Sequence, residues 1–81
     1  MDMYLKIVSP EKVVFEGGVD SVGVPGTVCP FVILKNHAPI ISSLVEGVVS
    51  YVSEDGEHSI KIAGGFVEVQ KNEIRLAVEE M

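Results

Sequence analysis

The thiol of Cys29 and the imidazole of His37 are the two side chains of this sequence that could act together as a nucleophile and a base. A thiol is a good nucleophile only where a nearby base or cation favours the thiolate, and the base needs a group that orients its ring. No carboxylate lies near His37 in the sequence, and Cys29 stands between Val28 and Pro30 in an apolar turn. We therefore expect Cys29 to behave as a small hydrophobic residue and His37 as a surface or contact residue.

Acidic side chains cluster at two places that could be read as metal or acid/base sites. Glu54, Asp55 and Glu57 surround one turn, and Glu79 and Glu80 stand near the end of the sequence. Solvated turns and tails commonly collect charge for solubility, which is the interpretation we favour. The single cysteine can form no intramolecular disulfide, and it lacks Cys or His partners at the spacing of a zinc site. The sequence thus predicts no catalytic residue, no metal and no cofactor.

Phosphate and nucleic-acid binding have little support in the sequence. Neither Gly17-Gly18 nor Gly64-Gly65 is followed by a Lys-Ser or Lys-Thr pair or opens a helix, as a phosphate-binding loop requires. Twelve acidic residues against six basic ones give a net charge of −6, which argues against a general nucleic-acid binder. We expect neither a nucleic acid nor a small-molecule substrate as a partner.

Lys61 is the basis of the alternative function that we keep open, a carrier domain modified on a lysine. Biotinyl and lipoyl carrier domains are acidic, all-β and of this length, with the lysine at a hairpin tip between apolar residues. Here the alternation of Ile60, Lys61 and Ile62 places the lysine in the middle of a strand, and the usual flanking residues of those carriers are absent.

The elements that must position these residues are predicted to be strands. Fifteen Val and seven Ile stand against four Leu and three Ala, and β-branched side chains suit a pleated surface. Short apolar runs are separated by turn residues at intervals of about eight to twelve residues or less, a pattern typical of a β-sandwich or barrel. With 81 residues we expect a single domain over residues 1–81. The pattern predicts about nine strands, at 4–8, 13–16, 19–24, 31–34, 40–45, 48–52, 58–62, 66–70 and 73–79.

Turn residues and alternation predict the strand connections and the core. Asp55-Gly56 and Lys71-Asn72 are expected to close hairpins, and Gly17-Gly18 to allow a tight reversal.

No signal peptide and no stretch that could span a bilayer are expected, which predicts a soluble intracellular chain. The side chains that we expect between two sheets are those of Val22, Val24, Ile60, Ile62, Val67, Val69, Ile74, Leu76 and Val78.

Several segments together resemble a known family. They are SPEKVVFEG at 9–17, VDSV at 19–22, VPG at 24–26, IL at 33–34, NHAP at 36–39 and GGFVEV at 64–69, which cover nearly the whole chain. In this order and spacing they resemble the epsilon subunit of bacterial F-type ATP synthase, whose mitochondrial counterpart is called delta.

The resemblance implies a β-sandwich of about ten strands, the N-terminal domain of epsilon, without catalytic residues of its own. It also implies a rotor subunit in the central stalk of a proton-translocating F-type ATP synthase. Such a subunit connects the gamma subunit to the membrane c-ring and so couples ion flow to ATP synthesis. It would lie peripherally at the cytoplasmic face of the bacterial inner membrane, held there through the complex.

The resemblance also assigns two contact surfaces. The end that faces the c-ring would comprise Val28, Cys29, Pro30, Asn36, His37 and Ala38. The surface that faces gamma would comprise Ser9, Ile40, Ile41, Ser42 and Arg75. Because consecutive strand residues face opposite sides, one of Ile40 and Ile41 is expected to be exposed to a partner.

The sequence departs from the usual pattern of that family in three respects. Pro30 stands in a turn that is usually Gly-rich and acidic, and Lys35 stands where Pro is common, which adds a positive charge to the ring-facing loop. Family members generally continue into a helical hairpin that can regulate ATP hydrolysis, and no such segment is present in residues 1–81. We therefore expect this chain neither to bind ATP nor to inhibit hydrolysis by inserting helices.

Overall fold

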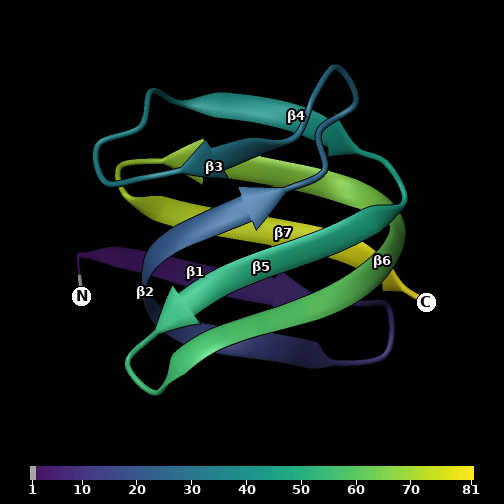
Figure 1. The fold of residues 1–81 in the computed structure, drawn as a ribbon, viewed down its shortest axis with the longest axis horizontal. Helices are drawn as coiled ribbons and strands as arrows, with labels where there is room; N and C mark the ends of the chain where they lie inside the picture. Colours follow the sequence, from purple (N-terminus) through teal and green to yellow (C-terminus); the bar gives the residue numbers. More distant parts are fainter. Residues whose placement is uncertain (1) are drawn as a thin grey trace.

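Seven β-strands and no helix make up the computed structural model, which describes residues 2–81 (Figure 1). The all-β prediction is thereby confirmed. Among these residues the structure contains no helix that is long and apolar enough to cross a membrane. The strands are β1 (Met3–Val8), β2 (Val13–Val24), β3 (Phe31–Ile33), β4 (Ile40–Leu44), β5 (Gly47–Ser53), β6 (Gly56–Gln70) and β7 (Glu73–Glu80).

The strands form one hydrogen-bonded sheet that folds over on itself into two layers. Its order is β1-β7-β6-β5-β2-β3, β4 pairs with β6, and an additional pairing of β1 with β2 closes the sheet on itself. All pairings are antiparallel except that of β1 with β7. The ribbon accordingly encloses a single interior, around which the long strands β2 and β6 curve (Figure 1).

The two longest strands explain why seven strands are present and not nine or ten. β2 runs unbroken through Gly17-Gly18, and β6 runs through Gly64-Gly65, so each contains two of the predicted runs. The predicted reversal at Gly17-Gly18 is therefore wrong. β2 pairs with β1 in its first half and with β3 and β5 in its second half. Because each long strand changes partners near its glycine pair, it belongs to both layers.

Gly65 is required by a close approach of two strands. A Cβ atom added at Gly65 would lie 2.2 Å from the carbonyl oxygen of Ala77 in β7, a distance that no real side chain tolerates. At neighbouring Gly64 the nearest atom would be the Leu44 carbonyl oxygen at 3.5 Å, an ordinary contact. The β6–β7 register shifts between Ile62 and Gly64, and such irregularities increase the local bend of a strand. Gly65 thus lets β6 bend against β7.

Alternating side chains from both layers form the core. Eight of the nine predicted core residues are buried, and the ninth, Ile60, is partly buried against the cluster. β1 contributes every second residue, which the list of predicted core residues omitted. The buried hydrophobic residues are Met3, Leu5, Ile7, Val19, Val22, Val24, Ile33, Leu44, Val49, Tyr51, Ile62, Val67, Val69, Ile74, Leu76 and Val78.

Two tight hairpins agree with the predicted turns. Glu54 and Asp55 connect β5 to β6, followed by Gly56 at φ +117°. Lys71 and Asn72 connect β6 to β7 with φ values of 53° and 62°. A two-residue hairpin with positive φ at both positions is a type I′ turn, whose twist matches that of the flanking strands. These turns fix the register of β5 with β6 and of β6 with β7.

Candidate docking surfaces

Cys29 and His37 do not form a nucleophile and base. Cys29 is exposed. His37 Nδ1 donates a hydrogen bond to the carbonyl oxygen of Ala38 at 2.8 Å, and its ring centroid lies 6.4 Å from that of Phe31. Within residues 2–81 no hydrogen bond joins the Cys29 thiol to the imidazole. Cys29 is therefore a surface group, whereas His37 is half-buried.

The acidic turn at 54–57 is a closed hairpin whose central carboxylate is hydrogen-bonded within the turn. The Asp55 carboxylate accepts a hydrogen bond from the Ser53 hydroxyl and a second one from His58 Nε2 at 2.9 Å. These two bonds, the first of them the larger influence, lower the pKa of Asp55 to about 2. In the described part of the chain no group of three or more His, Cys, Asp or Glu side chains could hold a metal ion. The carboxylate thus stabilises the turn.

Lys61 lies in the middle of β6, where it is exposed and faces Val48 of β5 across the pair. The tip of this hairpin is formed by Glu54 and Asp55, seven and six positions before the lysine. A carrier domain presents its modified lysine at a tip, so the geometry gives the carrier alternative no support.

An apolar groove with charged edges crosses the outer face of β1, β7, β6 and β4, and we call it the outer groove. Ile41 and Phe66 are its most prominent apolar side chains, 77% and 62% exposed, although residues of this kind are normally buried. Pairing across the strands places Phe66, Ala77 and Val8 in one row. The residues that line the groove are Lys6, Val8, Ile41, Phe66, Val67, Glu68, Arg75, Leu76 and Ala77.

Two of the five residues predicted to contact gamma line the outer groove, namely Ile41 and Arg75. Ile40 packs partly against the core, and Ser42 is in register with buried Val67, so both lie on the opposite side of β4. Ser9 lies in the β1–β2 turn, where its backbone N–H donates to the Lys12 carbonyl at 2.8 Å. The structure thus brings Ile41 and Arg75 together and places the other three elsewhere.

Phe66 was missed as a surface residue, although the sequence contains a signal for it. Val67 and Val69 were predicted to face inward, and period-two alternation then requires Phe66 to face outward. The sequence did not predict which exposed side chains would lie next to Phe66. Val8 and Ile41 come from strands that are distant in the sequence and reach this face only through the pairing of β1 and β4 around β6 and β7.

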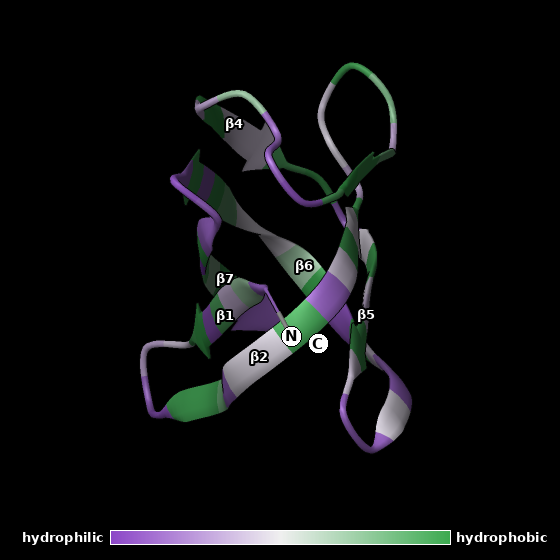
Figure 2. Ribbon diagram, turned by 90° about the vertical axis from the view of Figure 1, so that its left-hand side faces the viewer, coloured by the Kyte–Doolittle hydropathy of each residue, from purple (hydrophilic) through white to green (hydrophobic). Residues whose placement is uncertain are grey.

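Loop 25–30, between β2 and β3, presents an apolar tip. Val28 is 97% exposed, and Cys29 and Pro30 beside it are exposed as well. Figure 2 shows this tip coloured as hydrophobic, in contrast to the hydrophilic β5–β6 turn at the other end of the molecule. Thr27 anchors the loop, because its hydroxyl donates to the Ser43 carbonyl at 3.0 Å. The exposed Val32 and Val48 side chains border the same hollow.

Loop 34–39, between β3 and β4, holds the other predicted ring contacts. Asn36 and Ala38 are exposed and His37 is half-buried. The backbone N–H of His37 donates to the Leu34 carbonyl at 3.1 Å, and Asn36 has a φ of 66°. Loop 25–30 precedes the three-residue strand β3 and loop 34–39 follows it. Both loops lie on the upper side of the molecule in Figure 1. The predicted ring contacts therefore form two patches on one side.

Residues 2–81 match the profile of the family described as ATP synthase, Delta/Epsilon chain, beta-sandwich domain. The chain belongs to this family. The ATP synthase epsilon chain of Chlorobaculum tepidum is 42% identical over 78 residues, which are 95% of this chain and 89% of that protein. The epsilon chain of Leptospira borgpetersenii is 37% identical over 75 residues, 93% of this chain and 59% of that protein. The delta/epsilon chain recognised from turn and loop residues is thereby confirmed.

Solved structures show the same fold. A chain of the Euglena gracilis mitochondrial ATP synthase superposes with a TM-score of 0.89 at 17% identity, over 98% of this chain and 51% of that one. A chain of the Tetrahymena thermophila mitochondrial ATP synthase central stalk and c-ring gives a TM-score of 0.82 at 16% identity, over 99% and 65%. The β-sandwich prediction is confirmed.

The chain spans about three fifths of the length of several epsilon relatives, among them that of Leptospira. The family comprises delta and epsilon chains of ATP synthase, and the relatives that match are epsilon chains, which are subunits of an enzyme complex.

Proposed function

We propose that this delta/epsilon chain is a rotor subunit that connects gamma to the c-ring of a proton-translocating ATP synthase and so couples ion flow to ATP synthesis. The observation that carries the proposal is the presence, in a member of this family, of two separate exposed apolar surfaces on one closely packed body. A connector between two partners needs a stiff body with two adhesive surfaces and no reactive residue. The subunit would lie peripherally at the cytoplasmic face of the bacterial inner membrane through the complex.

The outer groove is the proposed gamma surface. Ile41 and Phe66 form an apolar centre, and Lys6, Glu68 and Arg75 lie beside it. An apolar centre with a charged rim is the usual anatomy of a protein interface. Ile41 and Arg75 are the contacts that we propose from the predicted set, and Phe66 is added by the structure.

Loops 25–30 and 34–39 are the proposed c-ring surface. Val28 at the tip of the first loop offers an apolar contact, and His37 and Ala38 offer polar and small ones. Lys35 adds a positive charge in the second loop, but its ammonium lies 3.0 Å from the Asp2 carboxylate within the same chain. The ring surface is therefore better described as apolar and polar than as positively charged.

Binding to gamma and to the ring can be measured separately. The wild-type chain is expected to bind isolated gamma, and to bind more tightly to a complex that also contains the c-ring. Val28→Glu is expected to lose the additional binding contributed by the ring and to retain binding to gamma. Glu54→Lys, in the β5–β6 turn on the opposite side of the molecule from these loops, is the matched control and is expected to retain both (Figure 1).

The same assay can overturn the proposal. If the wild-type chain bound neither gamma nor the ring-containing complex, the rotor function would be wrong. If Val28→Glu, and substitutions that reverse the charge of Lys35 and add acidic residues in the rest of loop 34–39, left binding and coupled ATP synthesis unchanged, the assignment of these loops to the ring would be abandoned.

A further inference from the structure

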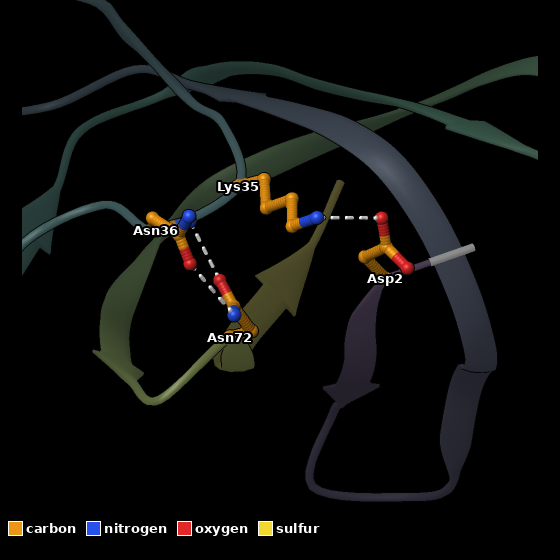
Figure 3. Close-up of polar contacts among 4 residues, drawn as sticks. All are labelled: Asp2, Lys35, Asn36 and Asn72. Atoms are coloured by element: carbon orange, nitrogen blue, oxygen red, sulfur yellow. Dashed lines mark hydrogen bonds and ion pairs between the residues drawn. The ribbon is translucent and has the colours of Figure 1, made fainter.

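The side chain of Asn72 joins two turns that lie 36 residues apart in the sequence. The backbone N–H of Asn36 donates to Asn72 Oδ1 at 2.7 Å, and Asn72 Nδ2 donates to Asn36 Oδ1 at 3.2 Å. Figure 3 shows the two amide groups facing each other between loop 34–39 and the β6–β7 turn. Two reciprocal hydrogen bonds therefore fasten the loop to the hairpin.

Both residues have a left-handed backbone conformation that suits this contact. Asn36 has a φ of 66° and Asn72 a φ of 62°, values that asparagine tolerates better than most residues. Asn36 is the third residue of the turn closed by the His37 N–H and the Leu34 carbonyl, the position where a type II turn requires positive φ. Because Asn36 directly precedes His37 and Ala38, holding it in place also sets the direction of those two residues.

The beginning of β1 converges on the same point. The backbone N–H of Tyr4 donates to the Asn72 carbonyl at 2.9 Å. Lys35, beside Asn36, pairs with the Asp2 carboxylate at 3.0 Å, so a second contact ties the loop to this end of the chain (Figure 3). Asn72 thus holds β1 through its backbone and loop 34–39 through its side chain.

We infer that Asn72 is a positioning residue, which fixes loop 34–39 on the sandwich so that His37 and Ala38 are presented in one arrangement to a partner. That the partner is the c-ring rests on the proposed function. Asn72 itself is half-buried in the hairpin turn, so it acts through the loop. Preorganising a loop in its bound conformation increases affinity, because less conformational entropy is lost on binding.

Three variants of the full chain separate the side chain of Asn72 from its backbone. Asn72→Gly retains the positive φ without strain and removes both side-chain hydrogen bonds. Asn72→Asp retains an oxygen that accepts from the Asn36 N–H. Lys71→Gly is the matched control, because Lys71 occupies the same turn with a φ of 53° and takes no part in the asparagine pair.

Amide hydrogen exchange of Asn36 in the isolated chain is the first measurement. Asn72→Gly is expected to accelerate exchange of the Asn36 N–H about ten-fold, the effect of losing ordinary hydrogen bonds. Asn72→Asp is expected to restore most of the protection, and Lys71→Gly to leave it unchanged. Equal exchange in Asn72→Gly and Lys71→Gly would overturn the inference. Should Asn72→Gly fail to fold, the scalar coupling across the hydrogen bond from Asn36 N to Asn72 Cγ in the wild-type chain decides, and its absence overturns the inference.

Binding is the second measurement, and it distinguishes a positioning role from a general structural one. Asn72→Gly is expected to weaken binding to the ring-containing complex several-fold while binding to isolated gamma is unchanged, because the outer groove does not include this turn. Equal weakening toward both partners would contradict a positioning role. If the wild-type chain bound neither partner, the proposed function would fail, and the exchange measurement would still decide whether Asn72 holds the loop.

Discussion

The ring of Tyr51 stacks on the imidazole of His58 across the β5–β6 hairpin, with ring centroids 5.2 Å apart. The two residues are paired directly in register, and the Tyr51 ring also contacts that of Phe15, with a centroid distance of 4.5 Å. His58 in turn lies 2.9 Å from Asp55 in the turn. A series of aromatic contacts that begins beside the core thus ends at a charged hairpin turn.

The Ser53 hydroxyl is the largest cause of the low pKa of Asp55, which lies at about 2 instead of its ordinary 3.8. A carboxyl whose pKa is lowered in the folded chain contributes stability above 3.8, and this contribution is lost as the pH falls toward 2. Ser53→Ala is expected to raise the pKa of Asp55, since only weaker causes then remain, namely the His58 contact and the backbone hydrogen bond of Asp55. The difference in denaturation midpoint between the wild type and the variant should shrink over the same pH range.

The titration can be followed directly by NMR through the carboxyl carbon of Asp55. Asp55→Asn is the control that assigns the signal, because it removes the titrating group. A midpoint that is the same in the wild type and in Ser53→Ala would show that the Ser53 hydroxyl does not set this pKa.

Ile41→Glu is expected to separate binding from stability. The side chain is 77% exposed, so the free energy of unfolding should change by no more than about 0.5 kcal/mol. A charge at the apolar centre of the outer groove should weaken binding to gamma by about ten-fold or more, as substitutions at the centre of an interface do. Urea denaturation and a titration with isolated gamma measure the two effects.

Ser59→Glu is a suitable companion to Ile41→Glu, since it places the same charge at an exposed residue of β6 that pairs with Ser50 of β5 and lies outside the groove lining. It should affect gamma binding much less. Loss of binding in Ser59→Glu but not in Ile41→Glu would be evidence against the outer groove.

Gly64→Ala and Gly65→Ala differ by a single position and should have very different effects. At Gly65 the new Cβ would meet the Ala77 carbonyl oxygen at 2.2 Å, and backbone atoms of a paired strand cannot move aside. We expect a loss of about 3 kcal/mol or more in the free energy of unfolding, the upper range for overpacking. Gly64→Ala, with its nearest contact at 3.5 Å, should remain within about 1 kcal/mol of the wild type. Similar denaturation midpoints for the two variants would contradict the bend assigned to Gly65.

The single cysteine is a natural probe of loop 25–30. Cys29 is exposed, so a maleimide should label the isolated chain completely and quickly. If the loop contacts the ring, labelling should become much slower in the assembled complex. A Glu54→Cys variant in a Cys29→Ser background places the thiol in the turn at the far end of the molecule and should remain reactive in both states (Figure 1). Equal labelling of Cys29 in both states would contradict a contact at this loop.

Local patterns in the sequence were sufficient for the strands and much of the core. Alternation of apolar and polar residues depends only on neighbours in the chain, and it placed Val67, Val69 and Leu76 inside correctly. The hairpin turns at Asp55-Gly56 and Lys71-Asn72 were predictable for the same reason, since turn type depends on the φ values of a few consecutive residues. The loops later assigned to partners were identified by their resemblance to a family.

Gly17-Gly18 and Gly64-Gly65 mark the limit of such local reasoning. A glycine pair allows either a reversal or a bend, and only the partners on each side decide which one occurs. Here β2 and β6 continue and exchange partners near their glycines, so the predicted reversal at Gly17-Gly18 and the predicted break between 58–62 and 66–70 become bends in two long strands. The candidate sites depend on the same pairing.

By itself the sequence determined that this chain is an acidic all-β domain whose motifs are those of the delta/epsilon family. The tertiary structure alone decided that Ile41, Phe66 and Arg75 share one groove and that Asn72 holds Asn36. The physical reason is that local conformation follows from short-range backbone and side-chain preferences, whereas a surface or a contact between distant turns depends on strand register. Register is set cooperatively, by the burial of one common core.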